Sequence, residues 1–268
     1  MKALREAMAR VGRHSRELLA ACRNLMGLLG QSVLWSARVA ARRAPLRRRD
    51  LARQMVRVGV NALPIVILCN MFVGMILAVS IAGLLETLGV LSWVSQVVAV
   101  AVTRELAPLL TAIIMSGFVG ASMAAELGAM TANEEILALE TSAVNPVRFL
   151  VVPRLWAVVA MLPCLTVLAM VAGMAGGFIV GTGLLGIGPV RYLTLNNNAL
   201  YLKDVLTALV KSAAFAVIIT VVACQEGLAV RGGAVGVGRA TTRSVVHCIF
   251  VLIAANLFFS VIFNYVMA

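Results

Sequence analysis

The chain has 268 residues, of which 62% are hydrophobic and only 13% are charged, and its formal net charge is +12. This composition excludes an ordinary soluble protein, and the long apolar runs predict an integral membrane protein. Because no hydrophilic linker is long enough to separate two folding units, we expect a single all-α membrane domain.

Positive charge is concentrated at the N-terminus. Residues 1–57 contain 14 of the 23 Lys and Arg residues and only three acidic residues. Beside membrane spans, such a segment marks the cytoplasmic surface and its anionic lipids, so nucleic acid is not expected as a partner. Residues 17–40 carry apolar side chains at spacings of three and four, which predicts an interfacial helix, with a true span as the alternative. A basic connector over 42–57 leads into the membrane domain at 58–268.

Five later stretches are apolar and long enough to cross a bilayer. They cover residues 58–85, 93–125, 151–185, 204–228 and 244–267. Between the last three of these spans we expect a polar loop at 186–203 and a glycine-rich basic loop at 226–243. The chain is therefore predicted to have five transmembrane helices.

Particular residues modify these spans. Asn61, Pro64 and Asn70 lie inside the first one and predict a bend or a polar lining. Runs of small residues at 116–125 and 173–181 predict close helix packing, which includes the seam of a homodimer.

The distribution of Lys and Arg predicts the orientation. One side of the membrane receives 19 of them, from residues 1–57 and the regions 126–154 and 226–243, whereas the other side receives only Arg191 and Lys203. The positive-inside rule then places the N-terminus in the cytoplasm. Five spans leave the C-terminus outside it.

A short polar stretch at 131–144 interrupts the apolar phase between the second and third spans. Thr131 as N-cap and Glu134 three residues later predict a capping box, and Asn145-Pro146 ends the helix. An amphipathic cytoplasmic helix in this place is suited to receive a push from a soluble partner. The residues expected to couple to that partner are Glu134, Glu135, Ile136, Leu139 and Glu140.

The sequence around this helix carries several motifs in a fixed order. They are RELAP at 104–108, AELGAM at 125–130, EEILALE at 134–140, VNPVR at 144–148, PR at 153–154 and RATTRSVVH at 239–247. In these motifs the chain resembles the MlaE/YrbE-type permease subunit of the Mla/MCE-associated phospholipid ABC transporters. The likeness extends from about residue 58 to the C-terminus.

This resemblance implies a function and a set of partners. It implies a homodimer in the bacterial inner membrane, bound to two ATP-binding cassette ATPase subunits and to a periplasmic MCE-domain ring, which moves phospholipid between the membrane and that ring. Two positions differ from the family pattern. Phe118 stands where the family usually has Arg, and Glu135 stands where it usually has Gln, and both bear on how the ATPase docks.

Motifs for catalysis are missing from the sequence. It contains no GxxxxGK[ST], HExxH or GxSxG, and its five cysteines and two histidines show no metal-ligand spacing. We therefore expect neither an enzyme nor a bound cofactor or metal. The energy for transport must then come from a separate ATPase.

Charged residues inside the spans are the best candidates for a site, because an unpaired charge at the centre of a bilayer costs at least about 3 kcal/mol. Arg104 and Glu105 adjoin in one span, and Lys211 in another is an evident partner for Glu105. With Asn70, these residues are predicted to line a lipid cavity, and a purely structural buried pair is the alternative.

Two further basic residues, Arg239 and Arg243, precede the fifth span, with Thr241 or Thr242 as its cap. They are expected to contact a lipid phosphate or a partner, or simply to anchor the chain on the positive side.

Three other functions remain open at the level of sequence. A lipid-modifying enzyme would need a catalytic constellation. An ion-coupled secondary transporter is suggested by Glu105 and Lys211, but it should show an internal repeat, and none is visible. A non-transporting membrane scaffold is the third alternative.

Overall fold

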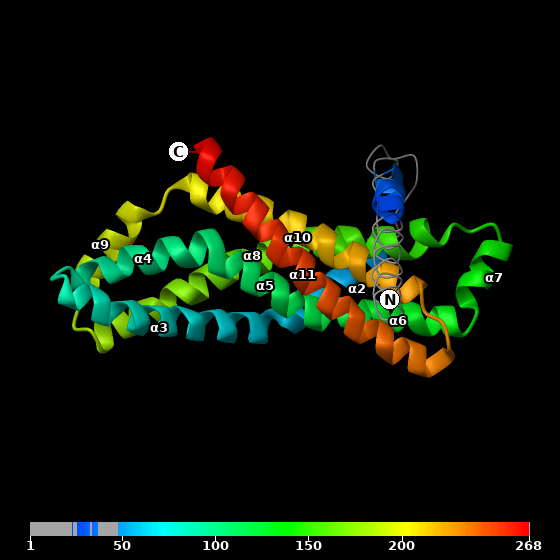
Figure 1. Cartoon of the computed structure of the whole chain (residues 1–268), viewed down its shortest axis with the longest axis horizontal. Helices are drawn as coiled ribbons and strands as arrows, with labels where there is room; N and C mark the ends of the chain where they lie inside the picture. The colour runs from blue at the N-terminus through cyan, green and yellow to red at the C-terminus, as the bar shows by residue number, and fades with distance from the viewer. Residues whose placement is uncertain (1–22, 24–25, 33, 37–47, 268) are drawn as a thin grey trace, which may run out of the picture.

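The computed structural model describes residues 23, 26–32, 34–36 and 48–267 (Figure 1). This part of the chain is helical and contains no β-strand. Five helical units are long and apolar enough to cross a membrane, which confirms the all-α, five-span prediction. They are Leu51–Thr87, Leu91–Ala132, Val147–Gly183, Leu202–Leu228 and Gly233–Phe263.

Short 3-10 and π segments divide the first three units. The first comprises α2 (Arg48–Gly59), η1 (Val60–Ala62) and α3 (Leu63–Thr87). The second comprises η2 (Leu91–Trp93), α4 (Val94–Ala101), η3 (Val102–Leu106), α5 (Ala107–Met115), η4 (Ser116–Gly120) and α6 (Ala121–Ala132). After α7 (Glu135–Thr141), the rest of the chain forms η5 (Val147–Val151), α8 (Val152–Gly183), α9 (Pro189–Ala199), α10 (Leu202–Leu228) and α11 (Gly233–Met267).

The first span begins earlier than the sequence suggested. The predicted connector at 42–57 is helical from Arg48 onward, because α2 continues through the 3-10 turn η1 into α3. Pro64 lies in the first turn of α3, where a missing N–H removes no helical hydrogen bond. The irregularity predicted from Asn61 and Pro64 is therefore a short 3-10 turn within one continuous helical unit.

The predicted capping box is wrong. The second span continues to Ala132, so Thr131 lies inside α6, where its Oγ1 donates to the carbonyl oxygens of Leu127 (2.8 Å) and Gly227 (3.3 Å). Glu134 has a φ of 60° and precedes α7 without a side-chain cap. The helix is thus shorter than the predicted 131–144, because the left-handed backbone at Glu134 separates it from α6.

Two predicted loops also contain helix. α9 occupies most of 186–203, and α11 begins at Gly233 rather than near 244. Thr241 is not a cap, because its Oγ1 donates within α11 to the carbonyl of Gly238 at 2.7 Å.

Glycines allow α3 and α8 to pack with their backbones in contact. A Cβ at Gly74 would collide with the Gly173 carbonyl, and a Cβ at Gly176 would collide with the Met71 carbonyl. The small-residue run at 173–181 therefore serves packing within the chain, as predicted in part.

Nearby, Tyr192 of α9 is buried against α8, and burial raises its pKa to about 12.

The described part of the N-terminal segment packs beside an apolar cluster. Leu28 is buried in that cluster with Leu127 and Leu150, and the Arg148 guanidinium lies 5.4 Å from the Trp35 ring centroid. In Figure 1 this segment runs across the long axis of the bundle. The rest of the predicted interfacial helix at 17–40 lies outside the described residues.

The two ends of the bundle carry different elements. α7 projects at one end, together with the end of α6 and the start of α11, whereas α9 lies at the other end (Figure 1). Among the described residues, charged side chains gather at two levels between these ends.

Candidate functional site

A break in the helical hydrogen-bond pattern creates the first charged cluster. Pro108 has no N–H, so the carbonyl of Arg104, four residues earlier, loses its helical donor. Residues Val102–Leu106 form the π segment η3, and the Ala107 N–H donates to the Val102 carbonyl. The Nζ of Lys211, on α10, donates to the freed Arg104 carbonyl at 3.2 Å. Pro108 therefore leaves a backbone carbonyl free to accept a hydrogen bond from the lysine of another span.

Lys211 also forms the predicted ion pair. Its Nζ lies 2.8 Å from Glu105 Oε1 and 2.9 Å from Ser260 Oγ on α11. Ser260 Oγ donates to the Glu105 carboxylate, at 2.8 Å to one oxygen and 2.9 Å to the other, and Asn256 Nδ2 donates to Oε2 at 3.1 Å. The carboxylate thus joins three spans. We refer to Arg104, Glu105, Asp204, Lys211, Asn256 and Ser260 as the charged network.

Arg104 has a carboxylate of its own. Its Nε and one terminal nitrogen both lie 2.8 Å from Asp204 Oδ1, at the start of α10. The other Asp204 oxygen accepts from the Tyr201 backbone N–H at 3.1 Å. Arg104 and Glu105 therefore do not neutralise each other, as their neighbouring positions on a helix require.

Burial divides the network into two kinds of residue. The side chains of Lys211 and Asp204 are 3% and 4% exposed, whereas those of Arg104 and Glu105 are 44% and 42% exposed. The buried residues hold the exposed ones in place, because a buried charge is stable only when paired. A cation and an anion are thereby presented together on the surface of the chain.

Asn70 does not join this network. It is 2% exposed, and its Nδ2 donates to the carbonyl of Val66 in its own helix at 2.9 Å. The four residues predicted to line one cavity therefore separate into a cluster of three and one residue in α3.

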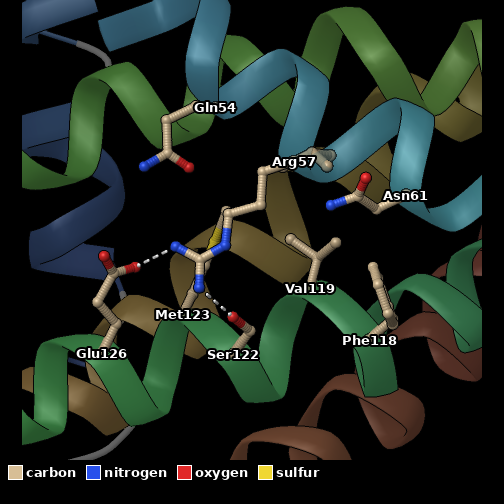
Figure 2. A pocket seen from close by; sticks show the side chains of 9 residues that line it. Gln54, Arg57, Asn61, Phe118, Val119, Ser122, Met123 and Glu126 are labelled. Atoms are coloured by element: carbon tan, nitrogen blue, oxygen red, sulfur yellow. Dashed lines mark hydrogen bonds and ion pairs between the residues drawn. The ribbon is translucent and has the colours of Figure 1, made fainter.

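The second cluster lies near the α7 end of the bundle. Glu126 Oε2 is 3.2 Å from the guanidinium of Arg57 and 3.1 Å from that of Arg154. A cavity of about 270 Å³ adjoins it between the α2–η1 region and the η4–α6 region. Figure 2 shows Arg57 reaching across this cavity to Ser122 and Glu126, with Phe118 farther along the same helix. None of the residues predicted to line a lipid cavity borders it.

Of the residues predicted to couple to the ATPase, some are packed against the chain and others are exposed. Ile136 and Leu139 pack inward against the cluster that contains Leu127 and Leu150, so they attach α7 to the rest of the chain. The predicted acidic residues and Leu137, which is 55% exposed, face outward. The acidic residues are Glu134, Glu135 and Glu140.

Known proteins resemble the chain over most of its length. A family model described as "Permease MlaE" matches residues 51–262. The chain belongs to the MlaE permease family. It is 39% identical over 215 residues to a probable ABC transporter permease protein of Synechocystis, covering 80% of this chain and 82% of that protein. It is 33% identical over 207 residues to the intermembrane phospholipid transport system permease protein MlaE of Haemophilus influenzae, covering 77% and 79%.

A third relative, a probable ABC transporter permease protein of the alga Pyropia yezoensis, is 38% identical over 201 residues, covering 75% of this chain and 76% of the relative. This MlaE-family chain is therefore an ABC transporter permease and a multi-pass membrane protein. Membership of a family of transport subunits confirms the expectation that it is not an enzyme.

The remaining predicted residues, Arg239 and Arg243, are exposed one turn apart on α11. Neither forms an ion pair with another described residue. Close by, His247 Nδ1 lies 2.8 Å from Glu226 Oε1, which joins α11 to the end of α10.

Sequence reasoning missed several members of both clusters. Asp204, Asn256 and Ser260 carry the polar contacts of the charged network but follow no motif. The only signal for Asp204 was its place as the sole acidic residue at the start of an apolar span. The pair of Arg57 and Glu126 joins residues far apart in the sequence, so no spacing reveals it.

Proposed function

We propose that this chain is the permease subunit of an ABC transporter that moves phospholipid, either to maintain lipid asymmetry or to exchange lipid between membranes. The observation that carries the proposal is the charged network, which presents a half-exposed cation and a half-exposed anion side by side within the spans. A phospholipid headgroup loses its hydration on entering a protein, and only paired polar groups compensate for that loss. The name of the Haemophilus relative agrees with such a substrate.

Each residue of the network has a proposed part. Arg104 meets the headgroup phosphate, and Glu105 meets a headgroup ammonium or hydroxyl. Lys211 and Asp204 hold these two side chains in place from positions that are almost fully buried.

ATP hydrolysis is proposed to occur on a separate ATP-binding cassette subunit that contacts α7. The outward side chains of α7 support this, since Leu137, Glu134, Glu135 and Glu140 are unburied at the end of the bundle. Closure of the ATPase would push α7. Because Ile136 packs against the chain's own core, the push would reach the spans.

The proposed complex lies in the bacterial inner membrane, with the N-terminus in the cytoplasm and the C-terminus in the periplasm, where an MCE-domain protein would receive or supply lipid. The charge distribution supports this orientation. Two copies of the chain are proposed to associate. The apolar span of α11 supports this, because only 11% of an 18-residue apolar stretch in it is buried and Phe250, Leu257 and Phe258 are exposed on it.

Affinity purification followed by reconstitution tests the proposal. The chain should co-purify with an ATPase, an MCE-domain protein and phospholipid, and the reconstituted complex should transfer fluorescent phospholipid only when ATP is supplied. Transfer driven by an ion gradient without ATP would favour a secondary transporter. A complex that binds its partners but transfers no lipid would favour a scaffold.

A further inference from the structure

The cavity near the α7 end is separate from the charged network. It lies farther along the second span, toward the α7 end of the bundle, beside the basic segment α2. Arg57, Asn61 and Phe118 line it and are exposed, so it opens to the outside of the chain. Its volume of about 270 Å³ falls just below the roughly 300–1,000 Å³ that hold a drug-sized ligand, which suits a headgroup but not a whole lipid.

Charge beside this cavity is not balanced. One carboxylate, Glu126, serves two guanidinium groups, so this cluster carries a surplus positive charge. The ion pair of Arg154 with Glu126 is the more firmly held of the two, because the Arg154 side chain is only 5% exposed and a buried charge needs its partner. Its Nε is buried without any hydrogen-bond partner among the described residues, which increases that need. The surplus charge therefore belongs to Arg57.

Arg57 is the cation that is free to take a ligand. Its side chain is 52% exposed, and it spans the cavity to donate to Glu126 Oε2 at 3.2 Å and to Ser122 Oγ at 3.0 Å (Figure 2). An exposed pair of this kind contributes little stability, so exchanging Glu126 for an incoming anion costs little. Ser122 Oγ is then free to donate to the same anion.

The surroundings indicate which anion. Phe118 borders the polar part of the cavity and is 45% exposed, which gives the site an apolar wall beside its cation. Glu126 Oε1 has no partner among the described residues and can accept from an ammonium. Phosphate, ammonium and an adjoining apolar chain occur together in phosphatidylethanolamine.

We propose that this cavity binds the phosphate of a membrane phospholipid, with Arg57 and Ser122 as donors and the start of an acyl chain against Phe118. The site is a second headgroup site, farther along the span that carries Arg104 and Glu105. The choice of a phospholipid rests on the proposed function, but binding here is measured without transport. Loss of this site would leave the charged network intact.

Photo-crosslinking tests the proposal. The full-length chain carries p-benzoylphenylalanine in place of Asn61, which lines the cavity, and is reconstituted in phosphatidylcholine vesicles with radiolabelled phosphatidylethanolamine. Illumination should attach labelled lipid to the chain. Arg57→Gln should lower the labelling about tenfold, since a charge-assisted hydrogen bond is lost. Arg53→Gln removes an exposed arginine one turn away that does not line the cavity, and it should leave labelling unchanged.

A second variant covers the case in which Arg57→Gln does not fold. Ser122→Ala removes a hydrogen bond whose donor is uncharged and should lower labelling about fivefold. The proposal is overturned if no lipid is attached, if Arg53→Gln lowers labelling as much as Arg57→Gln, or if illumination joins two copies of the chain instead. Competition by inorganic phosphate alone would show a site for free phosphate and would also overturn it. ATP-driven transfer that persists without labelling would refute this site but not the proposed function.

Discussion

Replacing Glu105 separates a lipid-binding role from a purely structural one. Glu105→Gln keeps the volume and the hydrogen bond from Ser260, but it removes the carboxylate that pairs with Lys211. Breaking a buried ion pair by removing one partner costs about 3–5 kcal/mol. We expect the lower end, about 3 kcal/mol, because Lys211 keeps the Arg104 carbonyl and Ser260 Oγ as acceptors.

The double variant Glu105→Lys with Lys211→Glu distinguishes the two roles. It restores an ion pair between the same two helices, so the thermal stability of the purified complex should return. Lipid transfer should not return, because the half-exposed position would now present a cation beside Arg104 and repel an ammonium group. Asn256 Oδ1 has no partner among the described residues and can accept from the new lysine after a flip of the amide.

The assay is ATP-dependent transfer of fluorescent phosphatidylethanolamine between vesicles, measured beside thermal unfolding of the same preparations. Single Glu105→Gln should lose both stability and transfer, and the double variant should recover stability alone. If the double variant recovers both, the pair is structural and Glu105 does not contact the headgroup. Recovery of neither would mean that the pair is not the main interaction of Lys211.

The remaining predictions concern coupling, packing and topology. Leu137→Asp on the outer face of α7 should abolish co-purification of the ATPase without changing the stability of the permease. Leu139→Asp should lower both the co-purification and the stability, because Leu139 packs against the chain's own core. Gly176→Val should destabilise the chain by about 1–3 kcal/mol through the α3 contact, and Gly183→Val, where a Cβ meets nothing, should be close to neutral in thermal unfolding. An alkaline phosphatase fused after Ala268 should be active, and a fluorescent protein fused there should be dark.

The apolar runs were sufficient to predict the number of spans but not their ends. The second span continued to Ala132 and the fifth span began at Gly233. Polar residues at the end of a span can still form backbone hydrogen bonds within the helix. The capping box at Thr131 failed for the same reason, since its hydroxyl found the Leu127 carbonyl inside α6. Local patterns specify a helix, whereas neighbouring helices decide where it stops.

The ion pair of Glu105 with Lys211 was predictable because both charges lie within apolar spans and each needs a partner. The other contacts of the two clusters were not predictable. Asn256 and Ser260 sit in a long apolar helix whose orientation depends on packing, and Arg57 finds Glu126 only when the first two spans lie side by side. These contacts depend on tertiary structure, which periodicity does not encode.

Both charged clusters follow one physical scheme. Each contains a half-exposed arginine paired with a carboxylate, together with charges that are almost fully buried. The buried charges are Asp204 and Lys211 in the network and Arg154 near α7. A buried charge cannot leave its partner without a large penalty, so it fixes that partner in the structure. Near α7, Glu126 stays paired with the buried Arg154, so Arg57 can exchange its contact for a phosphate. Under the proposed function, the two clusters would hold a headgroup at different depths along the second span, which is the arrangement that stepwise passage of a phospholipid requires.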